Sequence, residues 1–243
     1  MMENWVDHEL KDAELLDKRL EDRFKVLLDS LSQHSQASIP AACDARKEMV
    51  AAYRFFDNDK VTFESVLSPH IESSCRRVAK QKVALLVQDT TELDVTRPNS
   101  VMNGTGPLHN GNRNGALLHV LHAFTTDGTP LGTLYAEAWT REQRVAGQNQ
   151  PKRGSSEKRV ECARKPFEEK ESVRWLHTAQ RCSDLKKHCP KTQLVMLADR
   201  ESDLSQVIDC FLRQGVVLSG ECIELCQFDV EFSSPQFIGV TVR

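Results

Sequence analysis

Two continuous runs of apolar residues constrain this sequence more than any other feature. The first is Val83–Val87 and the second is Leu194–Ala198. Each run is too short for a buried helix, whereas a strand covered on both faces of a sheet shows this unbroken apolar pattern. The sequence therefore predicts an α/β fold in which both runs are strands.

An aspartate comes at or near the end of each apolar run. Asp89 lies two residues beyond the first run and Asp199 follows the second directly. Reacting groups collect at strand ends in α/β sheets, and carboxylates suit hard divalent ions, two of which can promote phosphodiester cleavage. An aspartate after a strand also caps turns and helices, and periodicity alone favours this ordinary role.

The residues before Lys82 have helical character. Apolar residues recur at three-to-five-residue spacing from Trp5 to Leu31, and similar patterns continue over residues 41–56 and 61–79. We therefore expect a bundle of short helices in front of the sheet.

After the first apolar run, the sequence predicts an antiparallel meander and then helix and strand in alternation. Leu117–Thr125 and Thr129–Trp139 flank the turn dipeptide Asp127-Gly128. Residues 168–188 predict a helix before the second apolar run. Further elements are predicted to begin with a helix at Asp203 and to include a strand at residues 216–218.

Composition excludes several classes of protein. No stretch approaches the roughly 18 apolar residues that a membrane span needs, and the charged N-terminus does not resemble a signal peptide. The eight cysteines include no C-x-x-C pair, so reduced thiols are favoured over a zinc site. We expect a cytoplasmic protein. Its net charge of −3 argues weakly against a free-standing DNA-binding module.

Positive charge is concentrated in one segment. Residues 141–165 contain eight basic and three acidic side chains, among glycines, glutamines and serines typical of a loop. Arg144, Lys152 and Arg153 are candidate contacts for DNA phosphates, although loop cations are often simply solvated.

Several motifs together resemble bacterial transposases of the insertion-sequence-four group, the Tn-five type. Gln88–Thr91 and Ala198–Asp203 are similar to the first two acidic motifs of that group. Ala52–Asn58 resembles its N-terminal Y-R-F motif, Leu117–Val120 resembles the strand after the first acid, and Glu169–Leu176 resembles an E-K-E-S-x-x-W-L segment. Each motif is weak alone, but their shared order over residues 5–214 is specific.

The resemblance implies a fold and an activity. It implies a helical transposon-end DNA-binding domain at residues 1–80 and a partial ribonuclease-H-like core, a mixed sheet with flanking helices, at residues 82–219. Asp89 and Asp199 would hold Mg²⁺ or Mn²⁺ for cut-and-paste transposition, and Tyr53 and Arg54 would contact transposon-end DNA. The partners implied are double-stranded transposon-end and target DNA, with a nucleoid location.

The sequence departs from the family after Asp199. The family's glutamate lies in a downstream motif with spaced Tyr, Arg, Glu and Lys, but both tyrosines of this chain, Tyr53 and Tyr135, precede Asp199. Residues 220–243 resemble nothing in the family. We therefore expect a frameshifted or truncated copy that lacks the family's dimerisation region and does not cleave DNA alone.

Two rival interpretations remain open. The chain could be a DNA-binding regulatory fragment without cleavage activity, or a metal-dependent hydrolase of another kind, which the N-terminal helical motifs argue against. A Tyr/Arg/Glu/Lys motif in another reading frame of the DNA immediately downstream would establish truncation.

Overall fold

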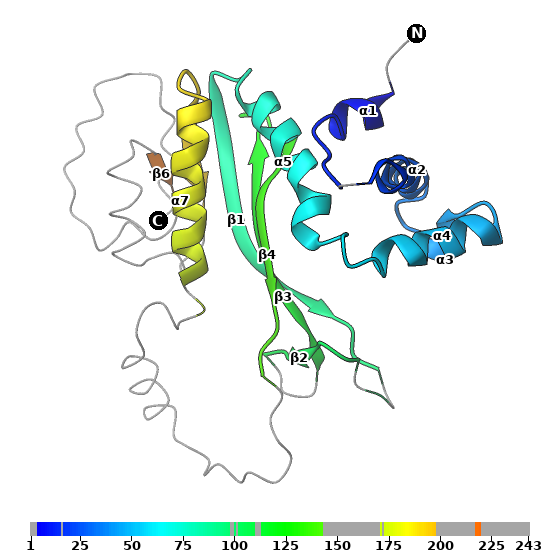
Figure 1. The fold of residues 1–243 in the computed structure, drawn as a ribbon. Coiled ribbons are helices and arrows are strands. Elements are labelled where there is room, and N and C mark those ends of the chain that lie inside the picture. Colours follow the sequence, from blue (N-terminus) through cyan, green and yellow to red (C-terminus); the bar gives the residue numbers. More distant parts are fainter. Residues whose placement is uncertain are drawn as a thin grey trace, which may run out of the picture. The chain divides into compact units, whose positions relative to one another are not determined.

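The chain forms two compact units, Met1–Arg77 and Val78–Arg243. A computed structural model describes residues 4–15, 17–97, 100, 102–109, 113–142, 171, 173–197 and 217–219. Figure 1 shows a group of helices in the first unit and a sheet in the second. The fold is thus mixed α/β, with a helical N-terminal region followed by a mixed sheet.

Two helices of the helical unit begin after an N-cap residue whose side chain accepts a backbone hydrogen bond. The Asn4 side chain accepts a hydrogen bond from the backbone of Val6, and Asp17 does so from Arg19 at 2.9 Å, which satisfies backbone donors that a helix leaves unpaired. The first helix ends at Glu9 and the second begins at Lys18, although the spacing of the apolar residues predicted one continuous helical pattern. The helices are α1 Trp5–Glu9, α2 Lys18–Gln33, α3 Ile39–Ala42, α4 Arg46–Phe56 and α5 Phe63–Val78.

Aromatic packing between α2 and α4 forms the centre of the helical unit's core. The rings of Phe24 and Phe55 stack with centroids 5.7 Å apart, and Leu27 and Ala52 are buried beside them. An Arg23–Glu48 ion pair of 2.5 Å joins the same two helices. The inner face of α4 is therefore committed to packing, which leaves its opposite face for other partners.

The second unit is built on a sheet with strand order β2-β3-β1-β5-β6, and β4 pairs with β3. β1 pairs antiparallel with β3 and parallel with β5, which is itself parallel to β6. The meander and parallel strands agree with the sequence prediction and are consistent with a ribonuclease-H-like core. The strands are β1 Val83–Asp94, β2 Gly106–Pro107, β3 Asn114–Phe124, β4 Pro130–Trp139, β5 Gln193–Leu197 and β6 Val217–Ser219.

The first strand is longer than the apolar run suggests. β1 continues through Asp89 to Asp94, because β3 remains hydrogen-bonded to it along that whole length. The sequence placed Asp89 just after the end of the strand, and this placement is wrong. The change from apolar to polar residues in the sequence shows where β1 becomes exposed. Its hydrogen bonds to the neighbouring strand determine where it ends.

One face of the sheet is packed beneath a helix. Every second residue of β3 is buried, and α7, Val173–His188, lies along this face (Figure 1). Trp175 of α7 packs edge to face on His119 of β3, with ring centroids 4.8 Å apart. No helix in the described part of the chain is long and apolar enough to cross a membrane.

The central strand offers a direct test of this packing. Leu86 is 0% exposed and Leu93 of the same strand is 42% exposed. Leu86→Ala should lower the free energy of unfolding by about 2–5 kcal/mol, because it leaves a cavity in the core. Leu93→Ala should change it by about 0.5 kcal/mol. Urea denaturation measures both, and equal losses for the two variants would contradict the assigned burial.

Candidate nucleic-acid interface and the Asp89 strand

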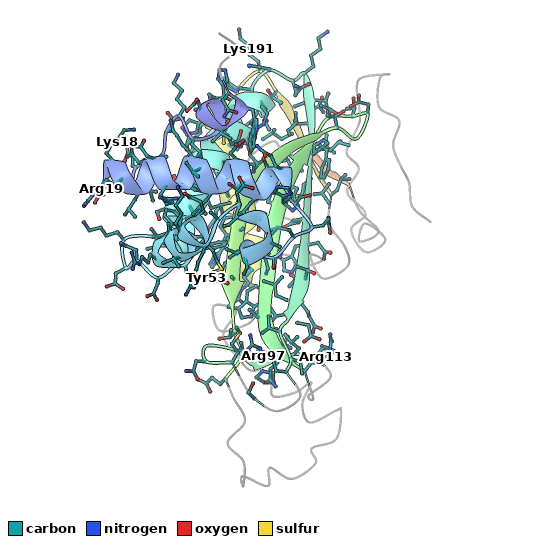
Figure 2. The ribbon with its side chains drawn as sticks, turned by 90° about the vertical axis from the view of Figure 1, so that its right-hand side faces the viewer. Lys18, Arg19, Tyr53, Arg97, Arg113 and Lys191 are labelled. Atoms are coloured by element: carbon teal, nitrogen blue, oxygen red, sulfur yellow. The ribbon has the colours of Figure 1, made fainter. Side chains whose placement is uncertain are left out.

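Cations gather on the outer face of α4. Lys47 and Arg54 are seven residues apart, as are Arg46 and Tyr53, and this spacing places each pair on one side of a helix. All four side chains are exposed, and Tyr53 is 48% exposed. Figure 2 shows Tyr53 in the helical unit, away from Lys18 and Arg19 at the start of α2.

These cations have no ion pair with an acid among the described residues, unlike the cations at the start of α2. Lys18 pairs with Glu21 and Asp22, and Arg19 pairs with Asp17. The one acid in the first turn of α4, Glu48, pairs instead with a residue of α2. The α4 face therefore carries uncompensated positive charge, although the unit as a whole is rich in acids.

The sequence motif identified only part of this face. Tyr53 and Arg54 were predicted to contact DNA, and the structure places both on the outer side of α4. The motif did not include Arg46 and Lys47, which extend the same face by two turns. Their seven-residue spacing from Tyr53 and Arg54 is the signal that could have revealed them.

Asp89 is exposed and lies in the interior of β1. Its Oδ1 accepts a hydrogen bond of 2.7 Å from the backbone N–H of Thr90. The second carboxylate oxygen makes no hydrogen bond within the described part of the chain. A carboxylate of this kind suits a divalent ion, and one such ligand alone does not make a metal site.

The other predicted site residues are not placed. Asp199, Arg144, Lys152 and Arg153 lie outside the described residues. The β1–β5 pairing can be followed as far as Val87 and Leu197. Within the described ranges, no group of three or more His, Cys, Asp or Glu side chains could hold a metal ion.

A buried polar column joins the Asp89 strand to α7. Thr178 of α7 donates its hydroxyl proton to the carbonyl of Arg174 at 3.0 Å, so it must accept from the Nε2–H of His119 at 3.1 Å. The Nδ1 atom of His119 therefore accepts from the Thr90 hydroxyl at 2.8 Å. This tautomer satisfies both ring nitrogens of a side chain that is 0% exposed.

Burial determines the charge of this histidine. Loss of hydration lowers the pKa of His119 to about 4, although the carboxylates of Glu137 and Asp89 oppose that change. His119 is consequently neutral near pH 7, as the tautomer requires. The ring connects the strand that carries Asp89 to the helix above it.

A second polar cluster is centred on Glu137 of β4. Its carboxylate accepts a 2.6 Å hydrogen bond from the Tyr135 hydroxyl and lies 3.2 Å from Nδ1 of His177 and 3.4 Å from Nε of Arg174. Burial alone would raise the pKa of Glu137, but these hydrogen bonds and the charge of Arg174 lower it below its usual value. Burial and the bond to Glu137 raise the pKa of Tyr135.

Three residues of the segment Glu169–Leu176 make contacts near this cluster. Glu171 accepts two hydrogen bonds of 2.7 Å from the Arg141 guanidinium, and Arg174 lies over the Trp139 ring at 3.5 Å from its centroid. Trp175 packs on the buried histidine of β3. Glu171 and Arg174 thus connect the start of α7 to the end of β4. The sequence analysis did not predict this structural role.

Comparison with known proteins supports the helical unit as a DNA-binding part. Residues 2–61 match the family model described as transposase DNA-binding. This range contains α1 to α4 and the exposed cations of α4. A search of curated proteins finds no match. The match supports a transposase-related DNA-binding role, with DNA as the partner.

The buried histidine generates a prediction about pH. The unfolded chain binds a proton at His119 below about pH 6.5, whereas the folded chain does so only near pH 4. The free energy of unfolding should therefore be fully retained above pH 6.5 and fall by about 1.4 kcal/mol per pH unit as pH drops toward 4. His119→Gln should remove this part of the pH dependence, measured by urea denaturation across the range.

His109→Gln is the matched substitution at an exposed histidine. A His119→Gln profile as steep as that of the unchanged protein would contradict the neutral buried ring.

Proposed function

We propose that this chain is a transposase of the insertion-sequence-four group whose helical unit binds transposon-end DNA through the outer face of α4. The observation that carries the proposal is the set of exposed cations at Arg46, Lys47 and Arg54, which have no ion pair within the described residues and lie in the segment that matches the DNA-binding family. Lysine and arginine neutralise DNA phosphates and release bound counterions. Tyr53 adds an exposed aromatic ring with a polar tip to the same face.

In this proposal the sheet unit corresponds to the core that cleaves and joins DNA strands in the family, and this chain alone is expected not to cleave, because it carries two of the family's three acidic ligands. In this proposal Asp89 and Asp199 hold Mg²⁺ or Mn²⁺, which would supply charge stabilisation at the reacting phosphate. The support for this pair of ligands is the position of the two aspartates relative to the paired strands. The last described pair between β1 and β5 is Val87 with Leu197, and each aspartate lies two residues further along its own sequence. The Thr90–His119–Thr178 column would hold the Asp89 segment in place.

A specific observation also favours a DNA-binding regulatory fragment as a second candidate function. The family match covers only the DNA-binding segment, which fits a fragment that binds transposon ends without cutting them. A gel assay with end-bearing duplex and Mg²⁺ or Mn²⁺ tests whether this chain cleaves. Binding without nicking is the result expected for the chain alone and also fits the regulatory fragment, whereas nicking at the transposon boundary that Asp89→Ala abolishes would show an active transposase and overturn the expected inactivity.

The α4 face generates a prediction about DNA affinity. Lys47→Ala and Arg54→Ala should each weaken binding to transposon-end duplex. Each should also reduce the slope of log affinity against log salt by about 0.9 if it removes one phosphate contact. Fluorescence anisotropy at several salt concentrations measures both quantities.

Lys18→Ala is the matched control, because it removes one exposed positive charge that acids of its own helix already compensate. It should leave the salt slope nearly unchanged. Equal effects of Lys18→Ala and Arg54→Ala would show that net charge, and not the α4 face, determines affinity.

The metal proposal has its own test, which does not require cleavage. Asp89→Asn and Asp199→Asn should each weaken Mn²⁺ binding at least about tenfold in calorimetry, since a neutral amide is a poorer ligand for a hard cation. Asp94→Asn on the same strand is the control, because Asp94 is already engaged by Thr96 and Arg113. Unchanged Mn²⁺ affinity in Asp89→Asn would exclude Asp89 as a ligand.

A further inference from the structure

One pole of the sheet unit, at the starts of β1 and β5 and the end of α7, is rich in lysine. Residues 78–82 and 184–193 contain five lysines and one acid, Asp184, and the β3–β4 turn at the same end of the sheet adds one further acid, Asp127. Lys186, Lys187 and His188 lie in the last turn of α7, where cations complement the helix dipole. The helix dipole does not explain the lysines on the neighbouring segments, which lie outside α7.

The remaining three lysines, Lys80, Lys82 and Lys191, form what we call the lysine pole. All three are exposed and have no ion pair within the described ranges. The backbone N–H of Gln193 donates to the carbonyl of Lys82 at 2.8 Å. Lys80 and Lys191 each lie two residues from one end of that hydrogen bond, so the pole joins two segments far apart in sequence.

The loop that carries Lys191 is held firmly. Thr192 is 0% exposed, and its hydroxyl lies 3.0 Å from the Gln81 carbonyl and 3.2 Å from the Val78 carbonyl. Lys186 donates to the carbonyls of Thr192 at 2.8 Å and Pro190 at 3.3 Å. The positive charges are therefore presented from an ordered backbone.

We propose that the lysine pole is a second DNA-binding surface, separate from α4, that contacts the phosphate backbone of double-stranded DNA. Uncompensated lysines gathered on an ordered surface attract a polyanion. No large exposed apolar side chain lies in the described residues of this pole. A single-strand site would need aromatic rings for base stacking, and a membrane site would need apolar groups for insertion.

The lysine pole and Asp89 occupy different parts of the same strand. Asp89 lies six residues beyond Val83, or about 20 Å along an extended strand. Figure 2 shows Lys191 at one end of the sheet unit and Arg97 and Arg113 at the other. Backbone contacts at the lysine pole would hold duplex of any sequence, whereas the α4 face is proposed to bind transposon ends.

The test uses the full chain and two triple variants at Lys80, Lys82 and Lys191, one with glutamine and one with arginine at all three positions. Anisotropy with a random-sequence 30-base-pair duplex measures affinity between low and moderate salt. The glutamine variant should bind at least about tenfold more weakly and lose up to about 2.7 from the salt slope, since each phosphate contact contributes about 0.9. The arginine variant should bind as the unchanged protein does.

The controls separate this inference from the proposed function. Both triple variants should keep the melting temperature of the unchanged protein, because the substituted side chains are exposed. If the glutamine variant keeps the full salt slope on random duplex, the lysine pole is not a DNA surface, even when Arg54→Ala still weakens end binding. Equal losses on single strands or on anionic phosphatidylserine vesicles would likewise overturn the assignment to duplex DNA.

Discussion

Backbone pairing of β1 on both sides is the constraint on which the sheet unit depends. β1 bonds to β5 over Val83–Val87 and to β3 over Leu85–Asp94. Within the described residues the two partners overlap over Leu85–Val87, and beyond Val87 the described pairing of β1 is with β3. Asp89 lies two residues beyond Val87. Its backbone is ordered by β3 while its carboxylate remains exposed, which is the combination that a ligand-binding acid needs.

Buried polar groups then give the sheet face under α7 a unique arrangement. A hydrophobic face alone would allow the helix to slide, because apolar contacts are not directional. His119 requires Thr90 on one side and Thr178 on the other, and Glu137 requires a guanidinium and a hydroxyl at particular positions. An unsatisfied member of either cluster costs free energy. These clusters therefore fix the register of α7 against the sheet.

The two units present positive charge in different ways. The helical unit contains more acids than bases in the segment that matches the DNA-binding family, and five of those acids pair with cations of α2. The cations of α4 have no ion pair within the part of the chain that the structure describes. A chain with a net charge of −3 can thus carry a positive face, because pairing on one helix leaves another uncompensated. Net charge is consequently a poor guide to nucleic-acid binding in this protein.

The sequence by itself determined the class of fold, the meander and the helical front, because hydrophobic periodicity and turn residues are local signals. It also pointed to Tyr53, Arg54 and Asp89, since each lies in a short motif. Only the tertiary structure decided that β1 continues past Asp89, that His119 is neutral and doubly bonded, and that Lys82 and Lys191 lie at one pole. Those features depend on strand pairing, burial and side-chain contacts between residues that are distant in sequence, which no local pattern records.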